Sequence, residues 1–327
     1  MNIIKFTKVA LGEHFGLALT TTGKVYQWGA INASTQLEIH KIDINNVKDI
    51  YCGSHHAFVI TNNDEVYGWG CNNFCQLTAK AAFFQETPIK IDIENVLSIA
   101  CGKYHSIFLH STGEVDVVGN NLYGQLGLAD KICRSELTMM GLTNVKSIAS
   151  GQFHSLFVTN HGNLYACGYN NVGQLGLKHF YDFYNHDFPR RVDLNNVINV
   201  YCGGLNSFCE TADNCFYSWG YNNEDELGIF VKGNTHTPTM MGFNIKNIVA
   251  GAYHTFVVSG SRTVPLTGFI SIAVAGTFSA MISDSGDLYT WGYPAGCQLG
   301  YKIEQAFVRN PELRIVFDRD VVDLTPE

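Results

Sequence analysis

The sequence is poor in proline and in charge, and it contains no long apolar run. It has 7 prolines in 327 residues, and charged side chains make up 15% of it. No Pro-rich, Ser-rich or charged segment divides the chain, so no linker between domains is predicted. No apolar stretch reaches the roughly 20 residues of a membrane-spanning helix. Glu13 and His14 interrupt the N-terminal apolar stretch, which argues against a signal peptide.

The chain also lacks the usual marks of nucleic-acid binding and of catalysis. Its net charge is −8, and no basic tail or patch is visible, so neither a nucleic-acid nor a membrane partner is expected. There is no phosphate-binding glycine loop, no nucleophile elbow and no prominent carboxylate pair. Cys71 and Cys75 have no second pair at zinc spacing. We therefore expect no cofactor, no metal and no catalytic residue for bond-making chemistry.

Ten cysteines are present, but their positions do not indicate disulfides. Cys52, Cys101 and Cys202 fill one slot of a repeat, just before a glycine, where other copies have Leu11 or Ser150. A slot that accepts small or apolar side chains predicts buried thiols in a reducing compartment, and hence a cytoplasmic location.

The dominant feature is an internal repeat in which a small residue, a glycine, two variable residues and usually a histidine precede an apolar strand. The copies lie about 50 residues apart, except that the last two are about half that distance apart. The repeated glycines are Gly12, Gly53, Gly102, Gly151, Gly203, Gly251 and Gly276.

Each full repeat predicts four short antiparallel strands. In the fourth copy these are residues 145–149, 155–159, 164–167 and 189–194. Four such strands make one propeller blade. The predicted fold is an all-β, seven-bladed β-propeller with one diminished blade, built as a single domain over residues 1–327. A six-bladed ring with the short unit as an insertion is the alternative. Strands near the two termini are expected to share one blade and so close the ring.

Three further positions recur and predict the framework. A Trp-Gly pair ends the third strand, as at Trp69-Gly70, and its large ring is expected to fill the wedge between blades. A Gln-Leu pair recurs in the following loop, as at Gln76-Leu77, with Leu as anchor and Gln bonding backbone. The recurring histidines are interpreted as structural; they are His56, His105, His154 and His254.

These sequence motifs resemble the repeats of the regulator of chromosome condensation family. The resemblance rests on residues 149–154 (ASGQFH), 164–168 (LYACG) and 170–176 (NNVGQLG), and it covers essentially the whole chain. It implies a β-propeller. The family's founding member is a guanine-nucleotide exchange factor for the small GTPase Ran, and many relatives are interaction modules only. Some effectors secreted by intracellular bacteria carry this propeller and act on host Ran, and the Asn- and Ile-rich composition suits such a source.

The resemblance also implies a binding face, formed by the turn between strands one and two and the loop between strands three and four. The second turn residue is aromatic or His in six of seven copies, which is typical of an interface. The alternative is that these rings plug the central channel. Glu13 is the only acid in the turns, which weakens the exchange-factor reading. The turn candidates are Glu13, His14, His55, Lys103, Tyr104, Phe153, Tyr253 and Phe278.

Two insertions are candidates for the protruding hairpin, called the β-wing, that the exchange factor presses against Ran. One is Lys178 to Phe188 and the other is Glu224 to Lys232. Exposed apolar loops of this kind mark partner sites; folding of each loop onto its own blade is the alternative. The residues singled out in them are Phe180, Tyr181, Phe183, Tyr184, Asp225, Glu226 and Phe230.

Two functions follow from these observations. The first is nucleotide exchange on a Ran-like small GTPase. The second is a non-catalytic scaffold that binds another protein through the same face. Either way we expect a monomer with a protein partner, acting in the cytoplasm, or in the host cytosol if the chain is a secreted effector.

Overall fold

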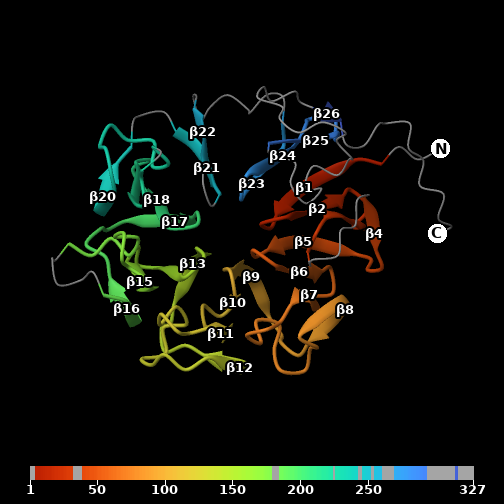
Figure 1. Cartoon of the computed structure of the whole chain (residues 1–327), viewed down its shortest axis with the longest axis horizontal. Coiled ribbons are helices and arrows are strands. Elements are labelled where there is room, and N and C mark those ends of the chain that lie inside the picture. Colours follow the sequence, from red (N-terminus) through yellow and green to blue (C-terminus); the bar gives the residue numbers. More distant parts are fainter. Residues whose placement is uncertain are drawn as a thin grey trace.

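The computed structural model describes residues 4–31, 39–178, 184–223, 225–241, 245–251, 254–259, 269–292 and 314–315. The described residues form strands and no helix, so they contain no helix able to cross a membrane. The strands are grouped into small sheets that follow one another around a ring (Figure 1). The all-β propeller predicted from the repeat is confirmed.

Five consecutive blades each contain four antiparallel strands in sequence order. The first comprises β1 (Phe6–Leu11), β2 (Phe15–Thr20), β3 (Val25–Gly29) and β4 (His40–Ile42); the second, β5 (Val47–Cys52), β6 (His56–Thr61), β7 (Val66–Cys71) and β8 (Phe84–Ile91); the third, β9 (Val96–Cys101), β10 (His105–His110), β11 (Val115–Gly119) and β12 (Arg134–Met139). The fourth comprises β13 (Val145–Ser150), β14 (His154–Thr159), β15 (Leu164–Gly168) and β16 (His186–Arg191); the fifth, β17 (Val197–Cys202), β18 (Asn206–Thr211), β19 (Phe216–Gly220) and β20 (Thr235–Met240).

The short repeat forms only a two-stranded sheet, from β21 (Ile245–Ala250) and β22 (Thr255–Ser259). The last sheet again has four strands, β23 (Ser271–Ala275), β24 (Phe278–Ile282), β25 (Leu288–Gly292) and β26 (Arg314–Ile315). Six complete blades are thus present among the described residues. This count agrees with the six-bladed alternative, and a seventh complete blade is not confirmed. The two-stranded sheet is nevertheless placed in the ring, because β21 contacts both β17 and β23.

Among the described residues the first and last sheets share no strand, but the C-terminal segment that was predicted to complete a shared blade lies outside the described residues except for Arg314–Ile315. The first and last sheets are each built from consecutive strands. Closure comes from packing of β1 against β23 and β24. The amide of Phe6 donates a 3.1 Å hydrogen bond to the carbonyl of Gly286, and the amide of Val9 donates a 3.1 Å bond to Ser271 Oγ. These contacts join the first sheet directly to the last.

The core lies in the wedges between neighbouring blades, as the Trp-Gly slot predicted. Trp28, Trp69 and Trp219 are fully buried. Trp69 packs among residues of the first and second blades, and its Nε1 donates a 2.7 Å hydrogen bond to Gln27 Oε1 of the first blade. Each wedge is filled from both sides, so a blade cannot bury its apolar face without its neighbours.

The Gln-Leu loop is held as expected. Leu77, Leu126, Leu175 and Leu227 are fully buried. In the second blade the amide of Leu77 donates to Asn72 Oδ1 at 2.8 Å, and the amide of Phe74 donates to Gln76 Oε1 at 3.1 Å. Equivalent bonds recur in the third and fourth blades. These contacts fix where each loop emerges.

Candidate functional site

One face of the ring carries both the turn after the first strand and the loop after the third strand of each blade. In the second, third and fourth blades the two are tied together by one backbone hydrogen bond. The amide of Cys71 donates to the carbonyl of His55 at 2.8 Å, that of Asn120 to Tyr104 at 2.8 Å, and that of Tyr169 to Phe153 at 2.9 Å. We call this face the loop face.

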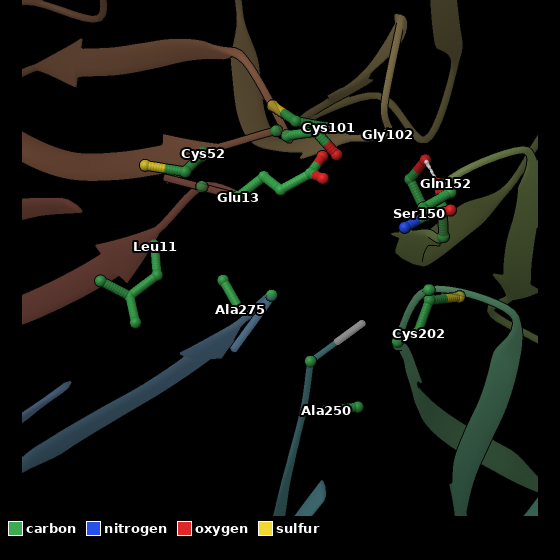
Figure 2. Close-up of a pocket in the computed structure, with 18 of the residues that line it drawn as sticks. Leu11, Glu13, Cys52, Cys101, Gly102, Ser150, Gln152, Cys202, Ala250 and Ala275 are labelled. Carbon is green, nitrogen blue, oxygen red and sulfur yellow. Dashed lines mark hydrogen bonds between the residues drawn. The ribbon is translucent and has the colours of Figure 1, made fainter. Parts of the chain in front are cut away.

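The turns surround a central channel at the middle of the ring (Figure 2). The cavity has a volume of about 190 Å³ and is lined by the repeated glycines together with the residues next to them. Glycine is required here for space: a Cβ on Gly102 would lie 2.1 Å from Cε1 of His105 and 2.8 Å from the carbonyl of Gly151. The amides of Lys103 and Gln152 donate to the carbonyls of Gln152 and Gly204 at 3.1 and 2.9 Å, so each turn is bonded to that of the next blade.

The repeated histidines belong to the framework. Nε2 of His56, His105 and His154 lies 2.9, 3.2 and 2.9 Å from a serine hydroxyl of the following blade. Each serine hydroxyl donates to a glutamine carbonyl, as Ser106 does to Gln76 at 2.8 Å, and must therefore accept from the imidazole Nε2–H. Burial lowers the pKa of each of these three histidines to about 3. They are neutral hydrogen-bond donors that join blades.

A charged cluster occupies the channel rim over the first three blades. Glu13 Oε2 lies 3.3 Å from Nε2 of His55 and 3.7 Å from Nζ of Lys103. Its other oxygen, Oε1, lies 4.0 Å from Nε2 of His14. Partial burial lowers the pKa of His55, and the nearby carboxylate of Glu13 opposes that shift. The single acid among the turns is thus already paired within the chain.

Half-buried aromatic side chains form two groups on the loop face. In one, the ring of Tyr104 lies 6.0 Å from that of His55 and 4.9 Å from that of Phe74. In the other, the ring of Tyr123 lies 5.3 Å from that of Phe153 and 5.1 Å from that of Tyr169. We call these six residues the aromatic arc: His55, Phe74, Tyr104, Tyr123, Phe153 and Tyr169.

The arc does not plug the channel. The channel is lined by the first turn residues, such as Glu13, Ser54 and Gln152, whereas the second turn residues His55, Tyr104 and Phe153 are not part of the lining. The aromatic members instead meet side chains of the strand-three to strand-four loops. In these turns the first residue therefore faces the channel, and the second residue faces the loops between strands three and four.

Phe278 is not a turn residue, and this expectation was wrong. It begins β24 and pairs with Gly292, as His56 pairs with Gly70, and it is fully buried. The turn after Gly276 is one residue shorter than the others, so Phe278 fills the histidine slot and Ser279 fills the serine slot. Nε2 of His254 lies 2.9 Å from Ser279 Oγ, in agreement with this register. Tyr253 lies outside the described residues.

The two wing candidates are only partly described. Phe180, Tyr181 and Phe183 lie outside the described residues, whereas Tyr184 is 75% exposed. Phe188 is not in a loop but in strand β16, with the guanidinium of Arg190 over its ring. In the second insertion Phe230 is fully exposed and Val231 is 47% exposed. Asp225 is exposed, but Glu226 is 5% exposed and occupies the slot of the buried glutamines.

Sequence reasoning missed part of the site. Phe74 and Tyr123 lie two residues before Gln76 and Gln125, and this shared offset was the signal that could have revealed them. It also missed a groove of about 310 Å³ beside His14 and His55, lined chiefly by apolar side chains that include Ile31, Phe83 and Phe84. Among the described residues no group of three His, Cys, Asp or Glu side chains is placed to hold a metal ion.

Comparison with known proteins identifies the repeat. Two family models, both described as the regulator of chromosome condensation (RCC1) repeat, match the chain. One matches residues 47–76, 96–125 and 145–174, and the other matches residues 63–109 and 161–209. The matched copies lie in the second to fifth blades, which include all six residues of the aromatic arc.

Two curated relatives match shorter stretches. A bifunctional serine/threonine-protein kinase/NEDD4-like E3 ubiquitin-protein ligase of Dictyostelium discoideum is 29% identical over 112 residues. The RCC1 domain-containing protein RUG3, mitochondrial, of Arabidopsis thaliana is 26% identical over 139 residues. These matches cover 34% and 32% of this chain, but only 5% and 31% of the relatives.

Solved structures match the chain nearly end to end. Prp20p of Saccharomyces cerevisiae, whose binding properties to Gsp1p and histones are described with its structure, has a TM-score of 0.67 at 22% identity. The match covers 93% of this chain and 76% of Prp20p. Human WBSCR16 has a TM-score of 0.66 at 22% identity, with 94% and 82% covered. At these identities the similarity establishes the fold.

Proposed function

We propose that this chain, a β-propeller that carries regulator of chromosome condensation repeats, binds a protein partner through its loop face. The partner we propose is a Ran-type small GTPase, whose guanine-nucleotide exchange the chain accelerates. The observation that carries this proposal is the aromatic arc, which gathers His55, Tyr104 and Phe153 with three loop aromatics on one face.

The arc has the physical character of a binding hot spot. Its rings are half-buried in the free chain, so their positions are set by neighbouring rings before a partner arrives. Preorganised aromatic side chains lose little conformational entropy on binding, and they dominate many protein interfaces. The groove beside His14 and His55 adds an apolar recess into which a partner side chain fits. Together they offer a rigid surface of mixed polarity.

Exchange requires no bond chemistry from the propeller. A protein that binds the nucleotide-free GTPase more tightly than the loaded form must, by reciprocity, weaken nucleotide binding. An apolar side chain that protrudes toward the phosphate site supplies this coupling. Phe230 is the described candidate for that role because it is fully exposed on the loop face. Phe183, which lies outside the described residues, is the candidate in the other insertion. The similarity to Prp20p, with its described binding to Gsp1p, supports the choice of partner.

A scaffold without exchange activity is the second candidate, and one observation favours it. Glu13 is the only acid in the turns, and it is already paired with His55 and Lys103. A carboxylate held in this way is less available to a partner's cationic groups. In this reading the aromatic arc still binds protein, but the partner need not release a nucleotide.

Nine cysteines among the described residues are free thiols, and burial raises the pKa of Cys101, Cys167 and Cys202. We propose on this basis that the chain acts in a reducing compartment such as the cytosol, that of a host cell if the chain is a secreted effector.

The experiment is a nucleotide-release assay. Ran and a panel of other small GTPases are loaded with a fluorescent guanine nucleotide, and its release is followed after addition of the chain and excess unlabelled nucleotide. Acceleration on Ran alone supports the exchange proposal. Binding to a GTPase or another protein through the loop face, without acceleration, leaves the scaffold.

A further inference from the structure

The outer strands of the blades form the perimeter of the ring, and one of them differs from the others. Four described outer strands contain six or more residues: β8, β12, β16 and β20. Three of them carry a proline at the same register position, namely Pro88, Pro189 and Pro238. The four strands can be aligned by the residue that pairs with the glycine at the end of the third strand. These pairs are Gly70–Gln85, Gly119–Arg134, Gly168–His186 and Gly220–Thr235. The proline lies three residues after the paired residue, and β12 has Leu137 at this position.

Leu137 directs its backbone groups away from the blade. The amide of Met140 donates to the carbonyl of Val115 in the neighbouring strand at 2.8 Å, and so points inward. Backbone groups alternate in direction along a strand, so Thr138 also points inward, whereas Leu137 and Met139 point outward. The same alternation places Pro189 outward, because the amide of Val192 donates inward to Leu164 at 2.9 Å. Proline at this position removes an unpaired N–H from the edge.

β12 also lacks a second feature that hinders pairing at an exposed sheet edge, which is a charged side chain. Two residues after the proline position, β8 has Lys90 and β16 has Arg191, which are charges of the kind that blunt sheet edges. β12 has Met139 there, and its side chain is 61% exposed. β20 has Met240 at this position but retains Pro238. Of these four outer strands, β12 alone lacks both the proline and the charge.

The open part of this edge is short and well defined. The carbonyl of Ser135, which also points outward, accepts a 2.7 Å hydrogen bond from the amide of Ala79 in the preceding blade. Beyond it, no described residue bonds the outward amides and carbonyls of Leu137 and Met139. At the other end a Cβ on Gly141 would meet nothing within 4 Å, so the approach to the edge is open.

We propose that a second copy of this chain pairs with this edge, β12 against β12, as an antiparallel two-fold dimer. With the two-fold axis at Thr138, Leu137 of each copy lies opposite Met139 of the other. Both pairs have their backbone groups pointing outward, so four N–H···O bonds form, two per pair. The axis position, Thr138 opposite Thr138, is then a pair without backbone bonds.

The strand is complementary to itself in this register. Leu137 and Met139 side chains of the two copies meet on one face, where Leu137 already packs against the wedge between the second and third blades. Glu136 of one copy lies opposite Met140 of the other, so no like charges face each other. The sequence alone indicates a monomer, and the edge is the feature that argues otherwise. The loop face remains open in such a dimer, so the proposal stands independently of the proposed function.

The test exploits the matched positions in β20. In the full-length chain, Thr138→Cys places two thiols across the two-fold axis, where Cα atoms of such a pair lie about 4.5 Å apart, within disulfide range. We expect mild oxidation to yield a covalent dimer that is stable until reduced. The control is Thr239→Cys, which lies directly after Pro238 in β20 at the position equivalent to Thr138. We expect this variant to stay monomeric, which would show that the native cysteines do not crosslink the chain.

Sedimentation velocity over a concentration series tests the unmodified edge. We expect a dimer population that rises with concentration, and at least a roughly tenfold weaker dimer for Leu137→Pro and for Met139→Lys. Met240→Lys is the matched control and leaves the association unchanged. Leu137→Pro copies what three other blades contain, so its fold is expected to survive, which circular dichroism verifies. A wild-type chain that stays monomeric at the highest concentration, or equal crosslinking of Thr138→Cys and Thr239→Cys, overturns the proposal. Capture of an extended segment of another protein on β12, with no dimer, does so as well.

Discussion

The imidazole Nε2 of His56 lies 2.9 Å from the hydroxyl oxygen of Ser106, which is 50 residues further along the chain and belongs to the next blade. The same link joins the third blade to the fourth and the fourth to the fifth. Each histidine is fully buried, so its hydrogen bond forms without competition from water. The repeated histidine therefore links neighbouring blades through a buried hydrogen bond.

Removal of one of these histidine side chains should destabilise the propeller. We expect His105→Ala to lower the free energy of unfolding by about 2–4 kcal/mol, because it creates a cavity and removes the imidazole that contacts both Ser150 and Ser155. His105→Asn introduces the residue that the fifth blade has at this position, Asn206, and should lower the free energy of unfolding by less. Urea denaturation followed by tryptophan fluorescence measures both. Equal stability of His105→Ala and the wild type would contradict the structural role.

Acid should destabilise the chain through the same residues. Burial lowers the pKa of His56, His105 and His154 to about 3 from an ordinary 6.5, so the unfolded state binds more protons than the folded state between these values. Stability is then lost as the pH falls below about 6.5. Three such groups make the chain about 4 kcal/mol less stable at pH 5.5 than at pH 7.5.

A single-site variant separates this effect from the titration of carboxylates. With His105→Asn, the loss between pH 7.5 and pH 5.5 should shrink by about a third, since one of the three proton-binding differences is gone. Urea midpoints at the two pH values provide the measurement. An unchanged pH dependence would assign the effect to other groups.

Much of this architecture was predictable from the sequence, because the repeat imposes similar packing on each complete blade. Trp69 in the wedge, Leu77 under its loop and His154 in the framework all have the roles that their recurrence indicated. Recurrence identifies a slot without requiring knowledge of its contacts. For the same reason it failed where a copy departs from the spacing, as at Phe278.

The proposed binding surface was predictable only in part. His55, Tyr104 and Phe153 follow from the turn positions, but their ring partners Phe74 and Tyr169 come from a loop whose path depends on packing against the next blade. The burial of Glu226 was also not visible, because an acid in a glutamine slot resembles a surface substitution. Loop geometry of this kind depends on tertiary contacts that the local sequence does not specify.

The aromatic arc should carry binding. We expect Tyr104→Ala and Phe153→Ala each to weaken binding of a Ran-type GTPase roughly tenfold or more, measured at temperatures below the unfolding transition of each variant. Leu97→Ala is the control, since this exposed residue lies at the opposite end of β9 from the turn. Isothermal titration calorimetry measures the affinities. Equal effects of all three variants would remove the arc from the interface.

The charged cluster should respond to loss of its acid. The carboxylate of Glu13 is the interaction that raises the pKa of His55 against the larger lowering effect of burial. We expect Glu13→Gln to lower the pKa of His55 further, because that opposing attraction is removed. NMR titration of the imidazole resonances follows this change, with His110, paired with Asp116 on another surface, as the internal reference. A rise in the pKa of His55 would contradict the assignment.

Phe230 should distinguish exchange from mere binding. We expect Phe230→Ala to reduce nucleotide release from the GTPase at least roughly tenfold while leaving stability unchanged, since the side chain is fully exposed and packs against nothing. Leu97→Ala, at an exposed apolar residue away from the loop face, is the control. If Phe230→Ala is neutral, deletion of residues 179–185, which stops short of β16, tests the alternative wing.

The proposed exchange activity is tested most directly by the affinity of the chain for Ran with and without bound nucleotide, measured by biolayer interferometry. We expect binding to nucleotide-free Ran at least roughly a hundredfold tighter than to the loaded form, and loss of that binding in the Tyr104→Ala, Phe153→Ala double variant. Equal affinity for the two forms would contradict exchange, and binding unaffected by the double variant would contradict the assignment of the loop face.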